Sequence, residues 1–134
     1  TMILNSAKPV RLCSALLVAT LLAGPANAGP FEDLAEAREA DERGDYATAF
    51  TRMRALAEAG YAPAQAEFGS LYFGGRGVSQ DFETAYRWFA LAASRIETAR
   101  ERDMALSNRD LAAQRLSPDQ IARAEDWVKA WRPR

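Results

Sequence analysis

The chain has 134 residues, and its 17 lysines and arginines nearly balance 18 acidic residues, which leaves a net charge of −1. Because there is no basic excess, nucleic acid is not an expected partner. The chain has no histidine and a single cysteine. It therefore lacks the commonest general base, has no imidazole ligand for a metal, and has only one thiol. We therefore expect no catalytic residues, no metal and no cofactor.

Residues 1–28 have the three parts of a secretory signal peptide. These parts are a basic start, an apolar stretch and a small-residue cleavage site: Lys8 with Arg11, residues 12–23 (LCSALLVATLLA), and Ala26 with Ala28. The apolar stretch, about twelve residues long, is shorter than the roughly 20 residues that span a bilayer. We therefore expect export to the periplasm, cleavage before Gly29, and no stable membrane span afterwards.

The remaining segment, 29–134, is long enough for one domain with its own hydrophobic core. Cys13 lies at the start of the apolar stretch and lacks the small residues that precede a lipid-modified cysteine. The segment 29–134 itself has no cysteine, so we expect a fold that is held by its core alone, without disulfides. Without Lys8 and Arg11, fifteen basic residues face eighteen acidic ones.

Apolar residues after position 30 recur at spacings of three and four, which is the period of a helix, and no segment alternates with period two. Glycine, proline and serine interrupt this pattern at several points: 44, 60–63, 74–77 and 117–118. The sequence therefore predicts an all-α fold of six helices, over residues 31–43, 46–59, 62–73, 82–94, 96–114 and 118–131.

Three of these helix starts carry capping side chains. Asp45 and Asp81 stand directly before the second and fourth helices, where a carboxylate accepts hydrogen bonds from free backbone amides. Ser117 and Gln120 have the spacing of a capping box. Pro118 occupies the first helical position, where its missing N–H costs nothing. The start at 118 is the clearest of the three.

Part of the chain repeats itself. Residues 44–57 (GDYATAFTRMRALA), shifted by 36 positions, fall on residues 80–93 (QDFETAYRWFALAA) with matching acidic, aromatic and alanine positions. A shift of 39 pairs Trp88 with Trp127, so the last helix reads as a third, diverged copy. Repeats of this length are typical of helical solenoids.

The stretch 62–94 carries a motif with many positions at fixed spacing. Its members are Ala62, Ala64, Gln65, Phe68, Gly69, Tyr72, Gly75, Gly77, Val78, Asp81, Ala85, Trp88, Ala92 and Ala93. In this pattern the chain closely resembles the Sel1-like repeat, a tetratricopeptide-like family, with Phe68 in place of leucine. The resemblance implies a short α-solenoid of stacked antiparallel helical hairpins. Residues 62–94 would form the complete repeat, within a domain over 29–134.

The resemblance weakens on both sides of this repeat. Position 52 is arginine where the pattern expects tryptophan, and the helix over 96–114 is longer and more polar than the pattern. The first two helices are joined through Gly44 without the glycine-rich loop. Terminal repeats of solenoids are atypical because they cap the stack. The outer half-repeats are therefore either caps or decayed repeats.

Several motif residues also have a physical reason. Gly69 inside a helix costs about 1 kcal/mol relative to alanine, so we expect a close contact between helices there. Gly75 and Gly77 let the following loop turn through positive φ. Bulky aromatic side chains are expected to fill the space between hairpins: Tyr72, Phe82, Trp88 and Phe89.

The resemblance also implies a function. The first helix of each hairpin lines the inner surface of such a solenoid, and in this family that surface typically contacts other proteins. We expect the groove to contain Arg38, Asp41, Glu42, Glu67, Ser70, Phe73, Arg102 and Arg109. Phe73 has an alternative position, packed under the glycine loop. We therefore expect an adaptor or regulatory module that binds a protein or peptide, and not an enzyme.

Two other functions stay open. One is a small cell-wall hydrolase with two carboxylates drawn from Glu67, Asp103 and Asp110. The other is a structural subunit of an envelope assembly. Residues 74–80 (GGRGVSQ) lack the GK[ST] of a phosphate loop, and residues 36–45 lack the spacing of a calcium loop.

Trp127 and Trp131 allow two interpretations. They lie four residues apart on the last predicted helix, so they could form an aromatic platform for a partner or a sugar. They also follow the apolar stripe that closes a helical core. We favour the core for Trp127, while Trp131 fits both interpretations.

Overall fold

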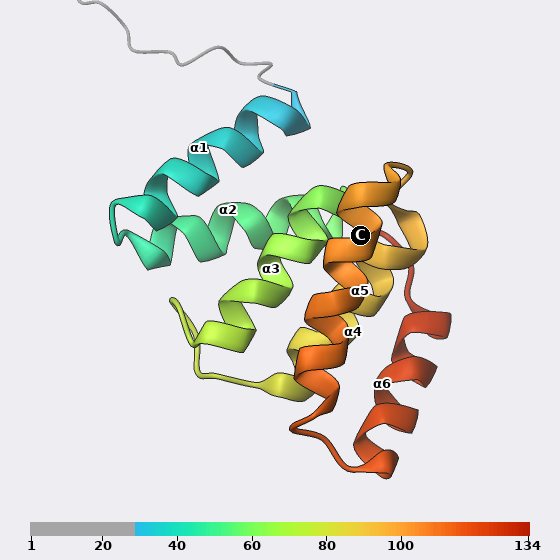
Figure 1. The fold of residues 1–134 in the computed structure, drawn as a ribbon. Helices are drawn as coiled ribbons and strands as arrows, with labels where there is room; N and C mark the ends of the chain where they lie inside the picture. Colours follow the sequence, from blue (N-terminus) through green and yellow to red (C-terminus); the bar gives the residue numbers. More distant parts are fainter. Residues whose placement is uncertain (1–28) are drawn as a thin grey trace, which may run out of the picture.

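The computed structural model of the protein describes residues 29–134, so the expected signal peptide lies outside the described residues. Within them the fold is all-helical and has no strand. Its six helices are α1 (Pro30–Glu42), α2 (Tyr46–Glu58), α3 (Ala62–Gly74), α4 (Phe82–Arg95), α5 (Ala99–Ala113) and α6 (Pro118–Ala130) (Figure 1). The predicted fold class and number of helices are confirmed.

The predicted boundaries agree with the structure to within one residue, except at the start of α5. That helix begins at Ala99, whereas the prediction began it at 96. Ile96 instead has an extended backbone, with φ −72° and ψ 127°, and its side chain is only 7% exposed. It packs in a cluster with Ala93 and Ala105. The burial of this side chain ends α4 and turns the chain toward α5, so the predicted start was wrong.

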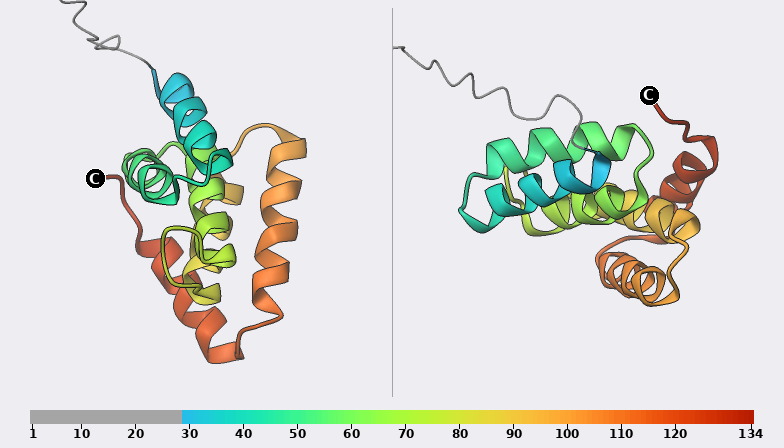
Figure 2. Two further views of the ribbon diagram at one scale, coloured as in Figure 1. Left: turned by 90° about the vertical axis from the view of Figure 1, so that its left-hand side faces the viewer. Right: turned by 90° about the horizontal axis from the view of Figure 1, so that it is seen from above.

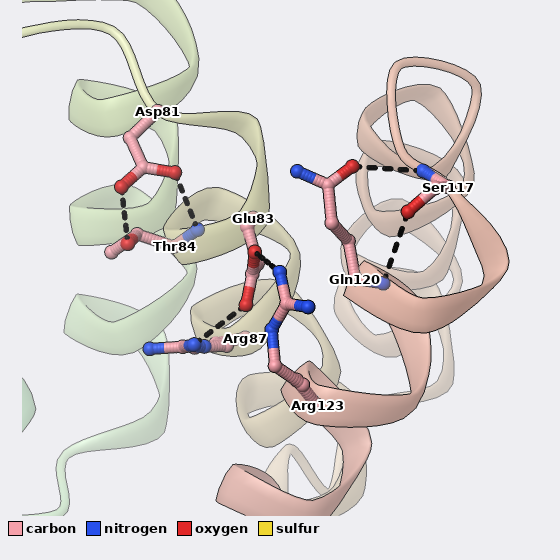
Figure 3. A network of polar contacts seen from close by, with 7 residues as sticks. All are labelled: Asp81, Glu83, Thr84, Arg87, Ser117, Gln120 and Arg123. Atoms are coloured by element: carbon pink, nitrogen blue, oxygen red, sulfur yellow. Dashed lines mark hydrogen bonds and ion pairs between the residues drawn. The ribbon is translucent and has the colours of Figure 1, made fainter.

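The capping residues do what the sequence predicts. Asp45 and Asp81 accept hydrogen bonds from the backbone amides three residues later, at 3.3 and 3.0 Å. The amide of Gln120 donates to Ser117 Oγ at 3.2 Å, and the amide of Ser117 donates to Gln120 Oε1 at 2.8 Å (Figure 3). The capping box is therefore complete.

The helices stack in the order of the chain up to α5. α1 packs on α2, α2 on α3, α3 on α4 and α4 on α5. α6 departs from this order because it packs mainly on α4, so that α5 and α6 lie on either side of α4 (Figure 2). The third hairpin is therefore open, unlike the closed hairpins formed by α1 with α2 and by α3 with α4.

A chain of aromatic rings forms the core between α2 and α6. Phe68 of α3 lies 5.1 Å from Phe50 and 5.1 Å from Trp88, measured between ring centroids. Trp88 then contacts Trp127 of α6 at 5.1 Å and Trp131 at 6.4 Å. Buried aromatic side chains supply large apolar areas and favour such tilted contacts. This aromatic chain explains why α6 docks on α4, because Trp127 of α6 and Trp131 directly after it pack against Trp88.

Two glycines of the repeat motif allow close approach. A Cβ atom on Gly69 would lie 3.0 Å from the ring of Phe89 and 3.2 Å from the carbonyl oxygen of Ala85, so α3 and α4 touch there. Gly77 has φ +69°, and its Cβ would lie 2.5 Å from the carbonyl oxygen of Tyr46. The glycine loop therefore turns through positive φ, as predicted, and also packs on the start of α2.

Polar contacts tie both ends of the described chain to the middle of the fold. Arg52 of α2 forms an ion pair with Glu36 of α1. After α6 the backbone returns to α2, where the amide of Arg134 donates to the carbonyl oxygen of Glu58 at 2.8 Å. The guanidinium of Arg95 of α4 covers the ring of Trp131 at 5.0 Å. These contacts hold α1 and the C-terminal segment on α2 and α4.

Candidate protein-binding groove

The structure has a hollow where the first helices of the three hairpins face one another. It has a volume of about 540 Å³. We call it the first hollow, and it is lined by Arg38, Pro63, Ala66, Glu67, Ser70, Ile96, Thr98, Arg100, Glu101, Met104 and Asn108. These residues come from α1, from α3, and from α5 with the segment that precedes it. The predicted role of the first helices as the lining therefore agrees with the geometry.

A second hollow continues the first one along α3 and α5. Its volume is about 230 Å³, and it is lined by Ser70, Phe73, Gly74, Arg76, Phe89, Asn108 and Leu111. Ser70 and Asn108 line both hollows, so the two are neighbours. Together they form what we call the groove. It follows α3 and α5, which run side by side in the same direction (Figures 1 and 2).

One ion pair joins two walls of the groove. Arg38 Nε of α1 donates to Glu67 Oε1 of α3 at 2.7 Å, and Arg38 Nη2 contacts the same oxygen. The hydrogen bond to Glu67 raises the pKa of Arg38 above its ordinary value, against the opposing effect of partial burial. This pair fixes α1 relative to α3 and leaves the carboxylate of Glu67 neutralised by a cation.

Apolar side chains form much of the groove surface. Pro63, Ala66 and Ile96 line the first hollow, and Phe73 and Phe89 line the second. Two large side chains of α5 stand exposed beside them: Met104 is 58% exposed and Leu111 is 49% exposed. Exposed apolar groups beside a hollow are the usual anchors of a protein interface.

Four of the eight residues predicted for the groove line it. Arg38, Glu67 and Ser70 line the first hollow, and Ser70 and Phe73 line the second. Phe73 also packs against two aromatic side chains of α4, Phe82 at 5.2 Å and Phe89 at 6.4 Å between ring centroids. It forms a wall of the hollow and is not a free anchor.

The other four predicted residues line neither hollow. Asp41 forms an ion pair with Arg76, which joins α1 to the glycine loop, and Glu42 is exposed at the end of α1. Arg109 is hydrogen-bonded to its neighbour Asp110 at 2.7 and 2.9 Å. Arg102 is exposed on another face of α5. Asp41, Glu42, Arg102 and Arg109 therefore lie outside the lining of the two hollows.

On α5 the lining of the two hollows differs from the expected one, which contained Arg102 and Arg109. The face toward the groove carries Arg100, Met104, Asn108 and Leu111, which recur at helical spacing. Ala105 and Ala112 mark the side of α5 that packs into the core. Met104 and Leu111 each precede one of these alanines, about 100° around the helix, and are exposed.

A separate polar network holds α6 on α4. Glu83 accepts hydrogen bonds from Arg87 at 2.7 Å and from Arg123 of α6 at 3.0 Å (Figure 3). Burial opposes ionisation of Glu83, but the bonds from Arg123 and Arg87 outweigh it and lower the pKa of Glu83. Each of the three charged side chains is bonded to another of them. The network therefore serves as a contact between α4 and α6.

A further hollow of about 480 Å³ lies between the α3–α4 loop and the α5–α6 turn. Its lining includes Asp81 and Gln120, whose side chains are already bonded to helix-cap groups. Arg115 covers the ring of Phe82 there, at 5.3 Å. These groups hold the two turns, so this hollow offers few free polar partners.

Three findings on residues 29–134 concern metal sites, membrane spans and carboxylates. No group of three or more metal-binding side chains occurs within residues 29–134. None of the helices α1 to α6 is long and apolar enough to cross a membrane. Glu67 and Asp110, two of the three carboxylates considered for hydrolysis, are each bonded to an arginine.

The tryptophans of α6 belong to the core. Trp127 and Trp131 are half-buried against Trp88, and arginine side chains cover their rings: Arg87 lies 5.9 Å from Trp127 and Arg95 lies 5.0 Å from Trp131. No aromatic platform is therefore presented. Comparison of the chain with protein-family models, curated proteins and solved structures returned no match.

Proposed function

We propose that this protein is an exported adaptor or regulatory module that holds a segment of another protein in the groove along α3 and α5. The observation that carries the proposal is the groove itself: two neighbouring hollows with apolar walls and two exposed apolar side chains, Met104 and Leu111. Neighbouring apolar hollows with a polar rim are what a protein interface requires.

The resemblance to the Sel1-like repeat is part of this proposal. Three observations support it: the close contact of Gly69 with Phe89, the positive φ of Gly75 and Gly77, and the burial of Trp88 between helices. Export is supported by the signal-like pattern of residues 1–28. Sequencing the N-terminus of the protein from a periplasmic extract tests it, with Gly29 as the expected first residue.

Site-specific photo-crosslinking in cells tests the binding function. A photoreactive amino acid at Asn108, which lines both hollows, should give a discrete adduct whose partner is identified by mass spectrometry. The matched control is position 42, which is exposed on α1 and lines neither hollow. Equal labelling from both positions, or none from Asn108, would refute binding in the groove. Adducts confined to position 42 would favour a structural subunit that docks through its ends.

A hydrolase would be detected separately. Purified protein and a Glu67→Gln variant are incubated with peptidoglycan, and soluble fragments are measured. We expect no release from either protein, because Arg38 holds the carboxylate of Glu67. Release that depends on Glu67 would replace the binding proposal with an enzymatic one.

A further inference from the structure

We propose that residues 131–134, which follow α6, form an exchangeable strap, and that the seat under this strap is a second binding site. The seat consists of residues at the end of α2 and on α4: Glu58, Gly60, Trp88 and Arg95. It takes an extended segment with an aromatic residue two positions before a proline, which is the pattern of Trp131 and Pro133. This inference goes beyond the proposed function, since the seat lies outside the two hollows of the groove.

The strap leaves α6 in an extended conformation. Trp131 has φ −63° and ψ 140°, which is the polyproline II region. The ring of Pro133 restricts its own φ and keeps the residue before it extended. The chain then returns to α2 (Figure 2). Such a segment needs little ordering when it binds, because proline has already removed much of its conformational freedom.

One backbone hydrogen bond joins the strap to the end of α2. The last carbonyl groups of a helix have no partner within the helix itself. In α2, residues of the following turn donate to the carbonyl oxygens of residues 55, 56 and 57, at 3.0 to 3.1 Å. The amide of Arg134 donates to the next carbonyl oxygen, that of Glu58, at 2.8 Å. Any extended segment with an N–H directly after its proline can make this bond.

Two side chains of the strap fit matching parts of the seat. The ring of Trp131 lies 5.0 Å from the guanidinium of Arg95 and 6.4 Å from the ring of Trp88, measured to ring centroids. A guanidinium over an indole is a favourable cation–π contact. Pro133 lies on Gly60, where a Cβ atom would stand 3.5 Å from the proline Cγ. The seat therefore matches an aromatic side chain and, two residues later, a proline.

The strap can leave the seat while α6 stays in place. Residues 132–134 are exposed, and Trp131 is partly buried. The side chain of Arg132 donates to the carbonyl oxygens of residues 129 and 131, so it stays with the end of α6 and not with the seat. α6 itself is held on α4 by Trp127 and by the polar network of Glu83. Exposed segments with few contacts open at a low free-energy cost.

The seat adjoins the groove. Gly60 and Arg95 line another hollow, of about 500 Å³. That hollow shares Pro63, Ile96 and Glu101 with the first hollow. Release of the strap therefore frees additional contact surface next to the groove.

The test uses the full chain and a labelled peptide with the sequence of residues 128–134 (VKAWRPR). Fluorescence anisotropy measures its binding to the unmodified protein and to a variant in which Trp131→Ala and Pro133→Ala together release the strap. The matched control is Arg134→Ala, which removes an exposed side chain and keeps the backbone amide that bonds Glu58. Circular dichroism checks the helices of each protein.

We expect the peptide to bind the released variant about tenfold or more tightly than the unmodified protein or Arg134→Ala, because the tethered strap competes for the seat in both of these. Alanine in place of the tryptophan or the proline of the peptide should weaken binding to the released variant. Arg95→Ala, added to that variant, should weaken it too, since the cation–π contact is lost.

Two results would overturn the inference. One is equal affinity of the peptide for the released and unmodified proteins, or no binding to either while the helices are intact. The other is binding that ignores the tryptophan and proline of the peptide. If the double variant loses its helical signal, Pro133→Ala alone, at an exposed position, takes its place with the same expectations. Binding in the groove is judged separately, by crosslinking at Asn108.

Discussion

The close contact of α3 with α4 at Gly69 can be tested by a single methyl group. In a Gly69→Ala variant the new Cβ would lie 3.0 Å from two carbons of the Phe89 ring and 3.2 Å from the carbonyl oxygen of Ala85. The ring cannot move away freely, because Phe89 is 2% exposed and packs against Phe73. The carbonyl oxygen is backbone of α4. The two helices must therefore separate.

Two effects oppose each other in this variant. Alanine in place of glycine inside a helix gains about 1 kcal/mol from helix propensity. Overpacking a tight core costs about 1–3 kcal/mol, and a steric conflict with backbone stands at the upper end of that range. We expect Gly69→Ala to lower the free energy of unfolding by about 1–2 kcal/mol. For a domain of this size the midpoint of thermal unfolding should fall by about 5–10 °C.

The matched control is Gly74→Ala in the same helix. A Cβ on Gly74 would meet only the flexible side chain of Arg76, at 3.5 Å or more, and its φ is not in the left-handed region. This variant should be neutral or slightly more stable. Urea and thermal unfolding, followed by circular dichroism, measure both. If Gly69→Ala stabilises the protein as much as Gly74→Ala does, the helices do not approach as described and the packing argument is refuted.

Three further variants test other contacts, each by urea unfolding. Gly77→Ala should lower the free energy of unfolding by about 2 kcal/mol or more, because φ is +69° and the Cβ would lie 2.5 Å from the carbonyl oxygen of Tyr46. An unchanged midpoint of urea unfolding would contradict the docking of the loop on α2. Ser117→Ala should lower the free energy of unfolding by about 1 kcal/mol through loss of the capping box. Ser107→Ala, on the exposed face of α5, is the control and should change it little. Equal effects of the two variants would contradict the role of the cap. Glu83→Gln should cost about 1 kcal/mol near pH 7 because it weakens the bonds with Arg87 and Arg123. The pKa of Glu83 is lowered in the folded state, so this contribution is complete above the ordinary value of 4.5 and is lost as the pH falls through the lowered value. The difference between Glu83→Gln and the unmodified protein should therefore shrink between pH 5 and pH 3, and a constant difference would rule out the ion pair as its source.

Much of the local structure could be predicted from the sequence. Asp45, Asp81 and Ser117 begin helices because each bonds backbone groups within three residues of itself. Gly69 also signalled a close contact before the contacting atoms were known, since glycine inside a helix is unfavourable unless its small size is needed. Such effects depend on near neighbours in the chain, so they can be recognised without the fold.

The groove was predicted only in part. The repeat resemblance indicated which helices line it, and Arg38, Glu67 and Ser70 lie there. On α5 the hollows are lined by residues such as Met104 and Leu111 and not by the expected Arg102 and Arg109. The face of α5 that lines them depends on how α5 docks on α4, through small side chains such as Ala105 and Ala112. The angle of such docking depends on residues distant in the chain.

The sequence by itself determined the six helices and their caps, because each arises from hydrogen bonds or backbone preferences over a few residues. Tertiary structure alone decided that α6 packs on α4 and leaves the third hairpin open, with Trp127 and Trp131 against Trp88 of α4. It also decided that Met104 and Leu111 flank one groove. Burial is a property of the whole assembly of helices, so it appears only once they are packed.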